Sequence, residues 1–427
     1  MWRTSWWVFR RISGAGHWMT RQFTTAGLYV VGAAILAAVF GVDTNQSLAY
    51  KIFTTLVALL AVAAIASRFA PGRFQVRRDL PRAVAVGEPF EYRVRLSNLG
   101  ARAIDGVALQ EDTGDPRPGL AEFRASARVP TYVGWLRAIE RNRVAHVEPP
   151  EVPRIPARGA VEIRVAGRAY RRGRMHFEGC AVAVCDPLGL VHRRFTTGSE
   201  AQLLVLPKRY KLPPLSLPGA RRYQPGGVTL SSHVGDSEES IGLRDYRPGD
   251  PIRRIHWKSF AKRGEPVVHE YQDEFFERHA LVLDTFGPGD RVFEEAVAVA
   301  ASLAQTLDTH DCLLDLMFVG DQAYTFTAGR GQLQPEGLLA VLAGVQPAHG
   351  REFRALHEAV RAKRAAMSGA LCVLLAWDEV RREFVREMRS TGLEMRVLVV
   401  SESPVDDAPP WLHVLHPDRM QQGLAAL

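Results

Sequence analysis

Cysteine is scarce in this chain, which has four cysteines in 427 residues. Cys180 and Cys185 are five positions apart, and no pair has the short Cys-x-x-Cys spacing of a zinc or redox site. A disulfide-stabilised secreted scaffold is therefore excluded, and the composition is typical of a reducing compartment. We interpret the cysteines as small buried hydrophobic residues.

The motifs of several enzyme classes are also missing. The sequence contains neither the Gly-x-x-x-x-Gly-Lys-[Ser/Thr] loop of a P-loop NTPase nor the Gly-x-Ser-x-Gly turn of an α/β-hydrolase. The run His357-Glu358-Ala-Val-Arg361 departs from the His-Glu-x-x-His zinc pattern, because arginine cannot replace the second histidine ligand. We therefore predict no catalytic residues and no enzyme.

Charged residues are nearly absent from two apolar runs near the start of the chain. Residues 26–42 contain none, and residues 48–66 contain only Lys51, close to the start of the run. Each run is near the ~20 residues that a helix needs to cross a bilayer. Since only residues 43–47 separate the runs, we predict a transmembrane helical hairpin within residues 1–70.

Basic residues flank this predicted hairpin on both sides. The chain has a formal net charge of +8, and by the positive-inside rule its flanking arginines predict a two-pass protein of the cytoplasmic membrane with both termini and the soluble domains in the cytoplasm. The surplus of positive charge then indicates contact with anionic lipid, and no nucleic-acid partner is expected. A signal peptide followed by a buried helix is the alternative. The tryptophans of the first segment fit an interfacial aromatic belt, namely Trp2, Trp6, Trp7 and Trp18.

Two patterns follow the hairpin. Residues 71–206 alternate with a period of two, as in Phe90, Tyr92, Val94 and Leu96, and predict an antiparallel β-sandwich with a helical insertion at 135–144. Residues 207–240 are rich in Pro, Gly and Ser and predict a linker. Residues 241–427 contain a signature motif and then alternate strands with helices, which predicts a doubly wound α/β domain.

The expected α/β strands lie at 279–284, 312–319, 323–327, 371–376 and 395–400, with helices at 292–307, 337–345, 354–367 and 380–389. The strands at 312–319 and 323–327 are expected to form an edge hairpin. Because doubly wound sheets bind ligands beyond the carboxyl ends of their strands, Asp284 and Asp378 are the candidate metal ligands.

The signature motif runs from Gly242 to Lys258. Pro248-Gly249 has the chemistry of a turn, Asp250 that of a helix N-cap, and Pro251 fits the first helical position. We predict a helix from Pro251 to about Arg263, ended by Gly264. Arg253 and Trp257 are expected in its buried arc, with Arg254, Lys258 and Lys262 on a basic outer edge.

A family resemblance rests on this motif. The spacing of Gly242, Arg244, Tyr246, Pro248, Gly249, Asp250, Arg253, His256, Trp257 and Lys258 resembles the signature of the bacterial domain of unknown function 58 family. The run Cys185-Asp-Pro-Leu-Gly-Leu190 is similar to an Asp-Pro-Phe-Gly-Leu turn of that family, with Leu188 in place of the aromatic residue. We expect a structural role for Asp186.

The resemblance implies a von Willebrand factor A-like C-terminal half and a MoxR-type AAA+ ATPase as partner, since the two genes are often neighbours. Magnesium-binding domains of that type carry Asp-x-Ser-x-Ser, whereas here Phe286 and Pro288 take the serine positions after Asp284. A site formed by Asp284 and Asp378 is therefore expected to be degenerate. We expect no cofactor, with Mg²⁺ as the single candidate.

Three functions remain open from the sequence. The leading hypothesis is a membrane-anchored, non-catalytic scaffold that works with the ATPase in complex assembly or maturation. The alternative is a divalent-metal-dependent adhesion module that uses Asp284 and Asp378. The third is an unrecognised hydrolase centred on His256 and Asp250, although a hydrogen-bonded structural role for His256 is favoured.

Overall fold

The computed structural model describes the chain except for residues 1, 41–46, 71, 127–128, 199, 214–239, 249–251, 253–254, 272–276, 288–290, 308–311, 330–333, 349 and 406. Two compact units share the chain. The first comprises residues 1–209 and 339–345, and the second comprises residues 210–338 and 346–427. Most of the predicted linker at 207–240 lies outside the described residues.

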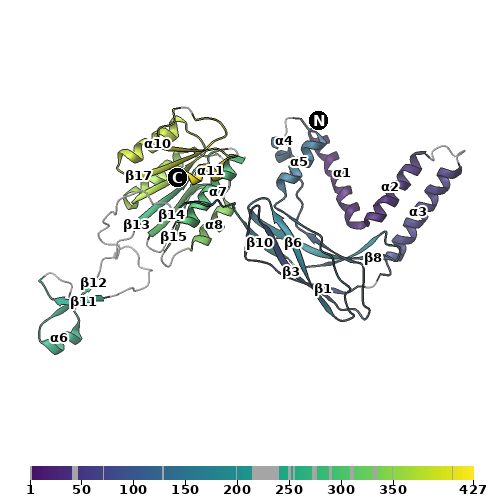
Figure 1. Ribbon diagram of the computed structural model, residues 1–427, viewed down its shortest axis with the longest axis horizontal. Helices are drawn as coiled ribbons and strands as arrows, with labels where there is room; N and C mark the ends of the chain where they lie inside the picture. Colours follow the sequence, from purple (N-terminus) through teal and green to yellow (C-terminus); the bar gives the residue numbers. More distant parts are fainter. Residues whose placement is uncertain are drawn as a thin grey trace. The chain divides into compact units, whose positions relative to one another are not determined.

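The first unit opens with three helices, α1 (Trp2–Gln22), α2 (Thr25–Phe40) and α3 (Ser47–Ser67). Helices α2 and α3 pair along their length (Figure 1). Within the described part of the chain, α3 is the one helix long and apolar enough to span a membrane, with a mean hydropathy of 2.1 over residues 48–67. Helix α2 is equally apolar in character but has 16 residues, so the two-pass topology stays a prediction.

Helix α1 was not predicted as a structural element. It packs through Trp2, Trp6 and Phe9 against α4 (Leu120–Ser126) and α5 (Tyr132–Asn142), where Phe123 and Trp135 are fully buried. This packing leaves Trp7 and Trp18 as the exposed tryptophans for the predicted belt. The helical insertion expected at 135–144 corresponds to α5.

The β-rich part of the first unit has three sheets around one apolar core. Strand β3 alternates as predicted, with Phe90, Tyr92, Val94 and Leu96 buried. All pairings are antiparallel except that of β2 with β10. The sheet orders are β1-β3-β6-β5, β2-β10-β7 and β4-β8-β9. The strands are β1 (Phe74–Asp79), β2 (Ala83–Ala85), β3 (Pro89–Asn98), β4 (Val107–Asp112), β5 (Ala145–Val147), β6 (Ala160–Ala169), β7 (Gly173–Phe177), β8 (Gly179–Cys185), β9 (His192–Thr197) and β10 (Ala201–Leu206).

The signature motif forms a hairpin and a short helix at the start of the second unit. Strand β11 (Ser240–Asp245) pairs antiparallel with β12 (Val267–Tyr271), and α6 (Trp257–Arg263) lies between them in sequence. The predicted helix start at Pro251 lies outside the described residues, but the continuous helix expected from there to Arg263 is wrong, because α6 begins at Trp257. Ile255 forms a β-bridge with Val268 instead, and an extended residue cannot belong to a helix.

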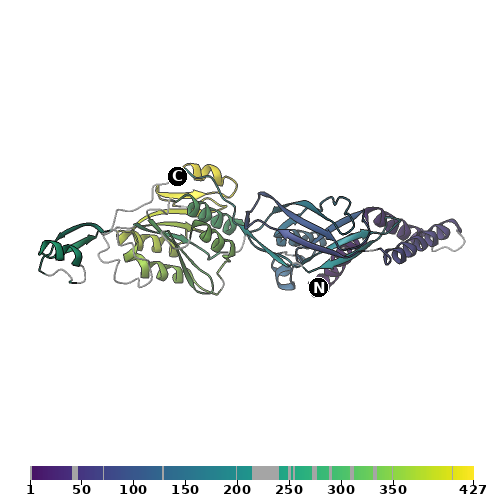
Figure 2. The same cartoon turned by 90° about the horizontal axis from the view of Figure 1, so that it is seen from below.

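The α/β part has a six-stranded sheet of order β15-β14-β13-β16-β17-β18. Strand β15 is antiparallel at the edge, as expected for the predicted hairpin, and the other pairs are parallel. Strand order reverses between β13 and β16, which makes their carboxyl ends the switch point. Figure 2 shows the sheet and its helices from a second side. The elements are β13 (Glu277–Leu283), α7 (Arg291–Thr306), β14 (Cys312–Val319), β15 (Ala323–Ala328), α8 (Pro335–Gly344), α9 (Arg354–Lys363), β16 (Gly369–Leu374), α10 (Glu379–Ser390), β17 (Glu394–Val400), β18 (Leu412–Leu415) and α11 (Met420–Ala425).

Candidate functional site

Asp284 and Asp378 both lie at the switch point, as the strand ends predicted. The fully buried Asp284 carboxylate accepts hydrogen bonds from the amides of Phe286 at 2.9 Å and Leu375 at 3.0 Å. Asp378 is the N-cap of α10 and accepts the Arg381 amide at 3.0 Å. Each carboxylate therefore has a structural task that loops at a sheet edge ordinarily require.

A guanidinium group joins the two carboxylates. Arg381 Nε lies 2.6 Å from Asp284 Oδ2, and Arg381 Nη1 lies 2.5 Å from Asp378 Oδ2. Nη2 also donates to the Phe286 carbonyl at 2.9 Å, and the group lies 4.8 Å from the Phe353 ring centre. Burial lowers the pKa of Arg381, but Asp284 and then Asp378 outweigh it and raise that pKa above its ordinary value. The residue was not predicted.

This arrangement does not fit a magnesium ion. Arg381 supplies the positive charge and takes the carboxylate oxygens that an octahedral ion would need. Phe286, at the first serine position, contributes an aromatic ring 5.8 Å from that of Phe353, whereas Pro288 lies outside the described residues. No group of three or more metal-ligating side chains occurs among the residues that the structure describes. We interpret Asp284, Asp378 and Arg381 as a structural ion-pair triad.

The triad predicts insensitivity to divalent ions. Millimolar Mg²⁺ or Mn²⁺ will leave the melting temperature of the full-length protein unchanged, because a bound ion would have to displace a buried guanidinium. Thermal unfolding in detergent, compared with KCl of matched ionic strength, measures the effect. A saturable rise in melting temperature with Mg²⁺ would show that the carboxylates do bind metal.

The signature residues form a folded module with an exposed edge. Gly242 pairs with Glu270 across the hairpin, and the Tyr246 amide donates to the Pro266 carbonyl at 2.9 Å. Trp257 is 58% exposed at the start of α6, so its expected burial is wrong. The prediction assumed one continuous helix, whereas Ile255 and His256, which directly precede Trp257, are not helical. Asp250, Arg253 and Gly249 lie outside the described residues, as does the side chain of Arg244, while Pro248 and Lys258 are exposed.

His256 is held within its own turn. Its Nδ1 lies 2.7 Å from Ser259 Oγ, and its backbone amide donates to the Val267 carbonyl at 2.8 Å. Gly264 then ends α6 with a φ of 76°, as predicted. Ser259 was not predicted, although its spacing of three residues places its side chain beside that of His256 on one helical turn. The geometry is that of the expected hydrogen-bonded structural histidine.

The Asp186 turn has the structural role expected of it. The buried carboxylate accepts backbone hydrogen bonds from Leu188 at 2.8 Å and from Leu190 and Val191 at 2.7 Å each. Carbonyl groups of this turn accept hydrogen bonds from Thr24, just before α2. Thr24 Oγ1 donates to the Gly189 carbonyl at 2.6 Å, and the Thr24 amide donates to the Leu190 carbonyl at 3.1 Å. The turn therefore fixes the β-rich part to the first apolar helix.

Two further contacts strengthen this attachment. A Cβ atom on Gly27 would lie 2.0 Å from the Leu190 carbonyl oxygen, so α2 can approach the turn only with glycine there. On β9, Arg193 donates to the carbonyls of Arg68 and of Ala70, the latter at 2.9 Å, just beyond the end of α3. The β-rich part is thus joined to the N-terminal end of α2 and to the C-terminal end of α3.

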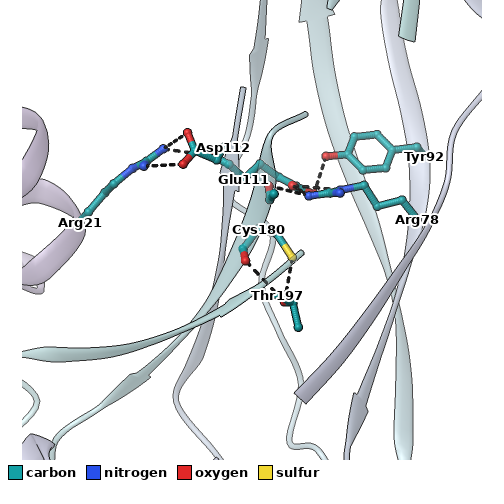
Figure 3. A network of polar contacts seen from close by, with 8 residues as sticks. Arg21, Arg78, Tyr92, Glu111, Asp112, Cys180 and Thr197 are labelled. Carbon is teal, nitrogen blue, oxygen red and sulfur yellow. Dashed lines mark hydrogen bonds and ion pairs between the residues drawn. The ribbon is translucent and has the colours of Figure 1, made fainter. Parts of the chain in front are cut away.

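A polar network continues the attachment to α1 (Figure 3). Arg78 and Glu111 form a buried ion pair at 2.5 Å, and the Tyr92 hydroxyl donates to Glu111 at 3.0 Å. The neighbouring Asp112 pairs with Arg21 of α1 at 3.3 Å. Burial and then Glu111 raise the pKa of Tyr92, so the phenol stays protonated. We interpret this network as structural.

Cys180 lies beside the network and has the inert character predicted for the cysteines. Its Sγ is 3.4 Å from the Thr197 hydroxyl (Figure 3), and burial raises the pKa of the thiol. A protonated, buried thiol is a poor nucleophile and a poor metal ligand.

Each comparison with known proteins covers less than half of this chain. The uncharacterized protein YeaD of Bacillus subtilis (strain 168) is 27% identical over 174 residues, which is 40% of this chain and 42% of the relative. The match thus spans less than half of the relative's length. Among solved structures, the CARDB domain of a Pyrococcus furiosus protein aligns with 31% of this chain and 93% of its own at 10% identity and a TM-score of 0.18. Salmonella alpha-2-macroglobulin aligns with 36% of this chain and 8% of its own at 13% identity and a TM-score of 0.19.

The family comparison includes the module and most of the sheet described above. Residues 242–409 extend from β11 through β17, so they contain helix α6 with the exposed Trp257 and the triad of Asp284, Asp378 and Arg381. This segment of the chain matches the model of the family described as protein of unknown function DUF58.

Proposed function

We propose that this protein is a membrane-anchored, non-catalytic scaffold that docks a partner protein through its signature module. One observation carries the proposal, namely the exposure of Trp257 on a helix whose backbone is fixed. Tryptophan is the residue type most enriched at binding hot spots, and 58% of this side chain is exposed. An indole that is already held in one conformation loses little conformational entropy when a partner covers it.

The fixed backbone around Trp257 supports this role. The β-bridge between Ile255 and Val268 holds the chain just before α6 against β12. The hydrogen bond from the His256 amide to the Val267 carbonyl, at 2.8 Å, does the same. The Phe260 ring, 6.0 Å from the indole, supports Trp257 from the next turn of the helix. Leu243 and Ile252 add 44% and 66% exposed apolar side chains to the same module.

Charge indicates the chemistry of the partner. Helix α6 contains Lys258, Lys262 and Arg263 and no acidic residue. A basic rim around an apolar anchor favours a partner with an acidic rim, since such rims mainly set the association rate and the choice of partner. The family resemblance supports a MoxR-type AAA+ ATPase as that partner, and complex assembly or maturation as the process.

The membrane anchor is the second part of the proposal. Helix α3 supplies the membrane-spanning segment. The Asp186 turn holds the β-rich part against the start of α2, and Arg193 holds it against the end of α3. The flanking arginines support a cytoplasmic location for the domains through the positive-inside rule. The two-pass topology belongs to the same proposal.

The sheet of the second unit supports a von Willebrand factor A-like assignment through its order and its antiparallel edge strand. Its switch-point carboxylates, however, are bonded to Arg381, which disfavours the metal-dependent adhesion alternative. The observed His256–Ser259 contact lies within one turn and gives no specific support to a hydrolase.

Affinity capture from detergent-solubilised native membranes tests the docking edge. Lys258→Glu is expected to reduce the recovered AAA+ ATPase several-fold without changing the melting temperature, because Lys258 is exposed. Lys363→Glu, an exposed lysine at the end of α9, is the matched control and should recover as much ATPase as wild type. If Lys258→Glu recovers as much ATPase as wild type, the basic residues of α6 do not contact the partner. If neither wild type nor either variant recovers an ATPase, the proposed partner is wrong.

A further inference from the structure

Helix α1 has an apolar face that its own packing does not use. Trp2, Trp6 and Phe9 face α4 and α5, whereas Trp7 and Trp18, which lie within about 20° of each other around the helix, are 54% and 57% exposed. Large apolar side chains gathered on one surface of a folded protein generally mark a contact with another molecule or with lipid.

Arginines lie among these tryptophans. The Arg11 guanidinium lies 4.7 Å from the Trp7 ring centre, and that of Arg10 lies 5.3 Å from Trp6. Together with Trp18 and Arg117 these residues line an open groove of about 550 Å³. Asp115 is the one carboxylate bonded there, to Arg117 at 2.6 Å and to Arg10 at 3.6 Å. Among the described residues, three guanidinium groups therefore face one carboxylate, so the groove favours an anion.

The position of α1 in the first unit indicates what covers this face. Helix α1 ends at Gln22 and α2 begins at Thr25, and the two helices diverge from this junction (Figure 1). The junction is fixed on the Asp186 turn by the Phe23–Val191 bridge and by Thr24. If α2 and α3 enter a bilayer at this point, α1 starts at the level of the lipid headgroups.

We propose that α1 is an interfacial helix that binds the surface of an anionic phospholipid bilayer. Trp7 and Trp18 enter the boundary between headgroups and acyl chains, where indole rings are favoured. The groove of Arg10, Arg11 and Arg117 binds a lipid phosphate, since guanidinium groups match phosphate oxygens in geometry and charge. The inference rests on the proposed membrane anchor and adds a second, lipid-specific contact to it.

Protection of a label at position 15 tests this contact, because Ala15 is exposed and lines the groove. Full-length Ala15→Cys, labelled with a nitrobenzoxadiazole dye, is reconstituted in phosphatidylcholine vesicles with and without phosphatidylglycerol. Glu91→Cys, on the exposed side of β3, is the control position. Labelling of wild type measures the background from Cys185, since the other three cysteines are buried. We expect dithionite to quench the dye at position 15 several-fold more slowly than at position 91 in the anionic vesicles.

Charge reversal then tests the groove. Arg11→Glu in the Ala15→Cys background should speed quenching several-fold, and so should omission of phosphatidylglycerol. Arg95→Glu, an exposed arginine of β3, is the matched change and should have no effect. Equal quenching at positions 15 and 91 overturns the inference. Protection that changes with neither Arg11→Glu nor the omission of phosphatidylglycerol also overturns it, since it would indicate a protein occupant.

Alkaline carbonate extraction separates this inference from the anchor. If the membranes retain the protein while position 15 remains fully accessible, the anchor is supported and the interfacial helix is contradicted. Release of the protein by carbonate contradicts the anchor, and with it the inference.

Discussion

Replacing Arg381 with leucine is expected to lower the free energy of unfolding of the second unit by about 3–5 kcal/mol, the usual cost of removing one partner of a buried ion pair. The fully buried Asp284 would lose the cation that balances its charge, although it keeps the amides of Phe286 and Leu375. Denaturant unfolding of the full-length protein in detergent, monitored by circular dichroism, measures the loss.

Two variants make this result specific to the triad. Arg386→Leu breaks an exposed pair with Glu379 on the same helix and should cost less than about 1 kcal/mol. Asp284→Asn combined with Arg381→Leu should recover part of the loss, because a neutral amide leaves no buried charge. Wild-type stability of Arg381→Leu alone would show that the triad does not hold the switch point together.

Asp186→Ala is the second change with a large expected effect. It removes a buried carboxylate that accepts three backbone amides, for a loss of about 3–5 kcal/mol at the usual value of charge-assisted bonds. The turn should also release Thr24, so that protease cleaves the chain between α1 and α2 faster than in wild type. Unfolding in detergent and limited proteolysis measure the two consequences.

Asp105→Ala is the matched control for that change. Asp105 is exposed, and its pair with Arg154 at 3.5 Å is expected to contribute less than about 1 kcal/mol. If Asp186→Ala loses stability but keeps the α1–α2 junction resistant to protease, then the turn stabilises the β-rich part without fixing the helices to it.

Periodic patterns predicted much of the architecture. The alternation around Tyr92 and the strand–helix alternation after Glu277 are signals that follow from local geometry, and both elements are present. The positions of Asp284 and Asp378 beyond the carboxyl ends of strands followed from the same reasoning, whereas their meeting at the switch point depends on the strand order. Strand β18 and helix α11 were missed because they have only 4 and 6 residues, too few for a period to show.

Arg381 could have been found from the sequence. It lies four residues before Val385 and seven before Met388, which are both buried on the apolar side of α10. A charged residue at that spacing must have a buried partner, and Asp378 lies three positions earlier. The contact with Asp284, 97 positions away, depends on the sheet order and has no local signal.

The continuous signature helix was predicted wrongly for a physical reason. Asp250 and Pro251, which lie outside the described residues, have ideal capping types, but the pairing of Ile255 with Val268 determines the backbone just before α6. Helix α1 shows the same limit. Trp2, Trp6 and Phe9 have helical spacing, yet their partners Phe123 and Trp135 lie more than a hundred residues away.

Photo-crosslinking from position 257 in intact cells tests the proposed docking most directly. Trp257→p-benzoylphenylalanine places the reactive group on the exposed start of α6, and the same residue at Val380, 50% exposed on α10, is the control. We expect a crosslink to an AAA+ ATPase of the MoxR type from position 257, and none from position 380. Crosslinks to that ATPase from both positions, or from neither, would contradict docking through the signature module.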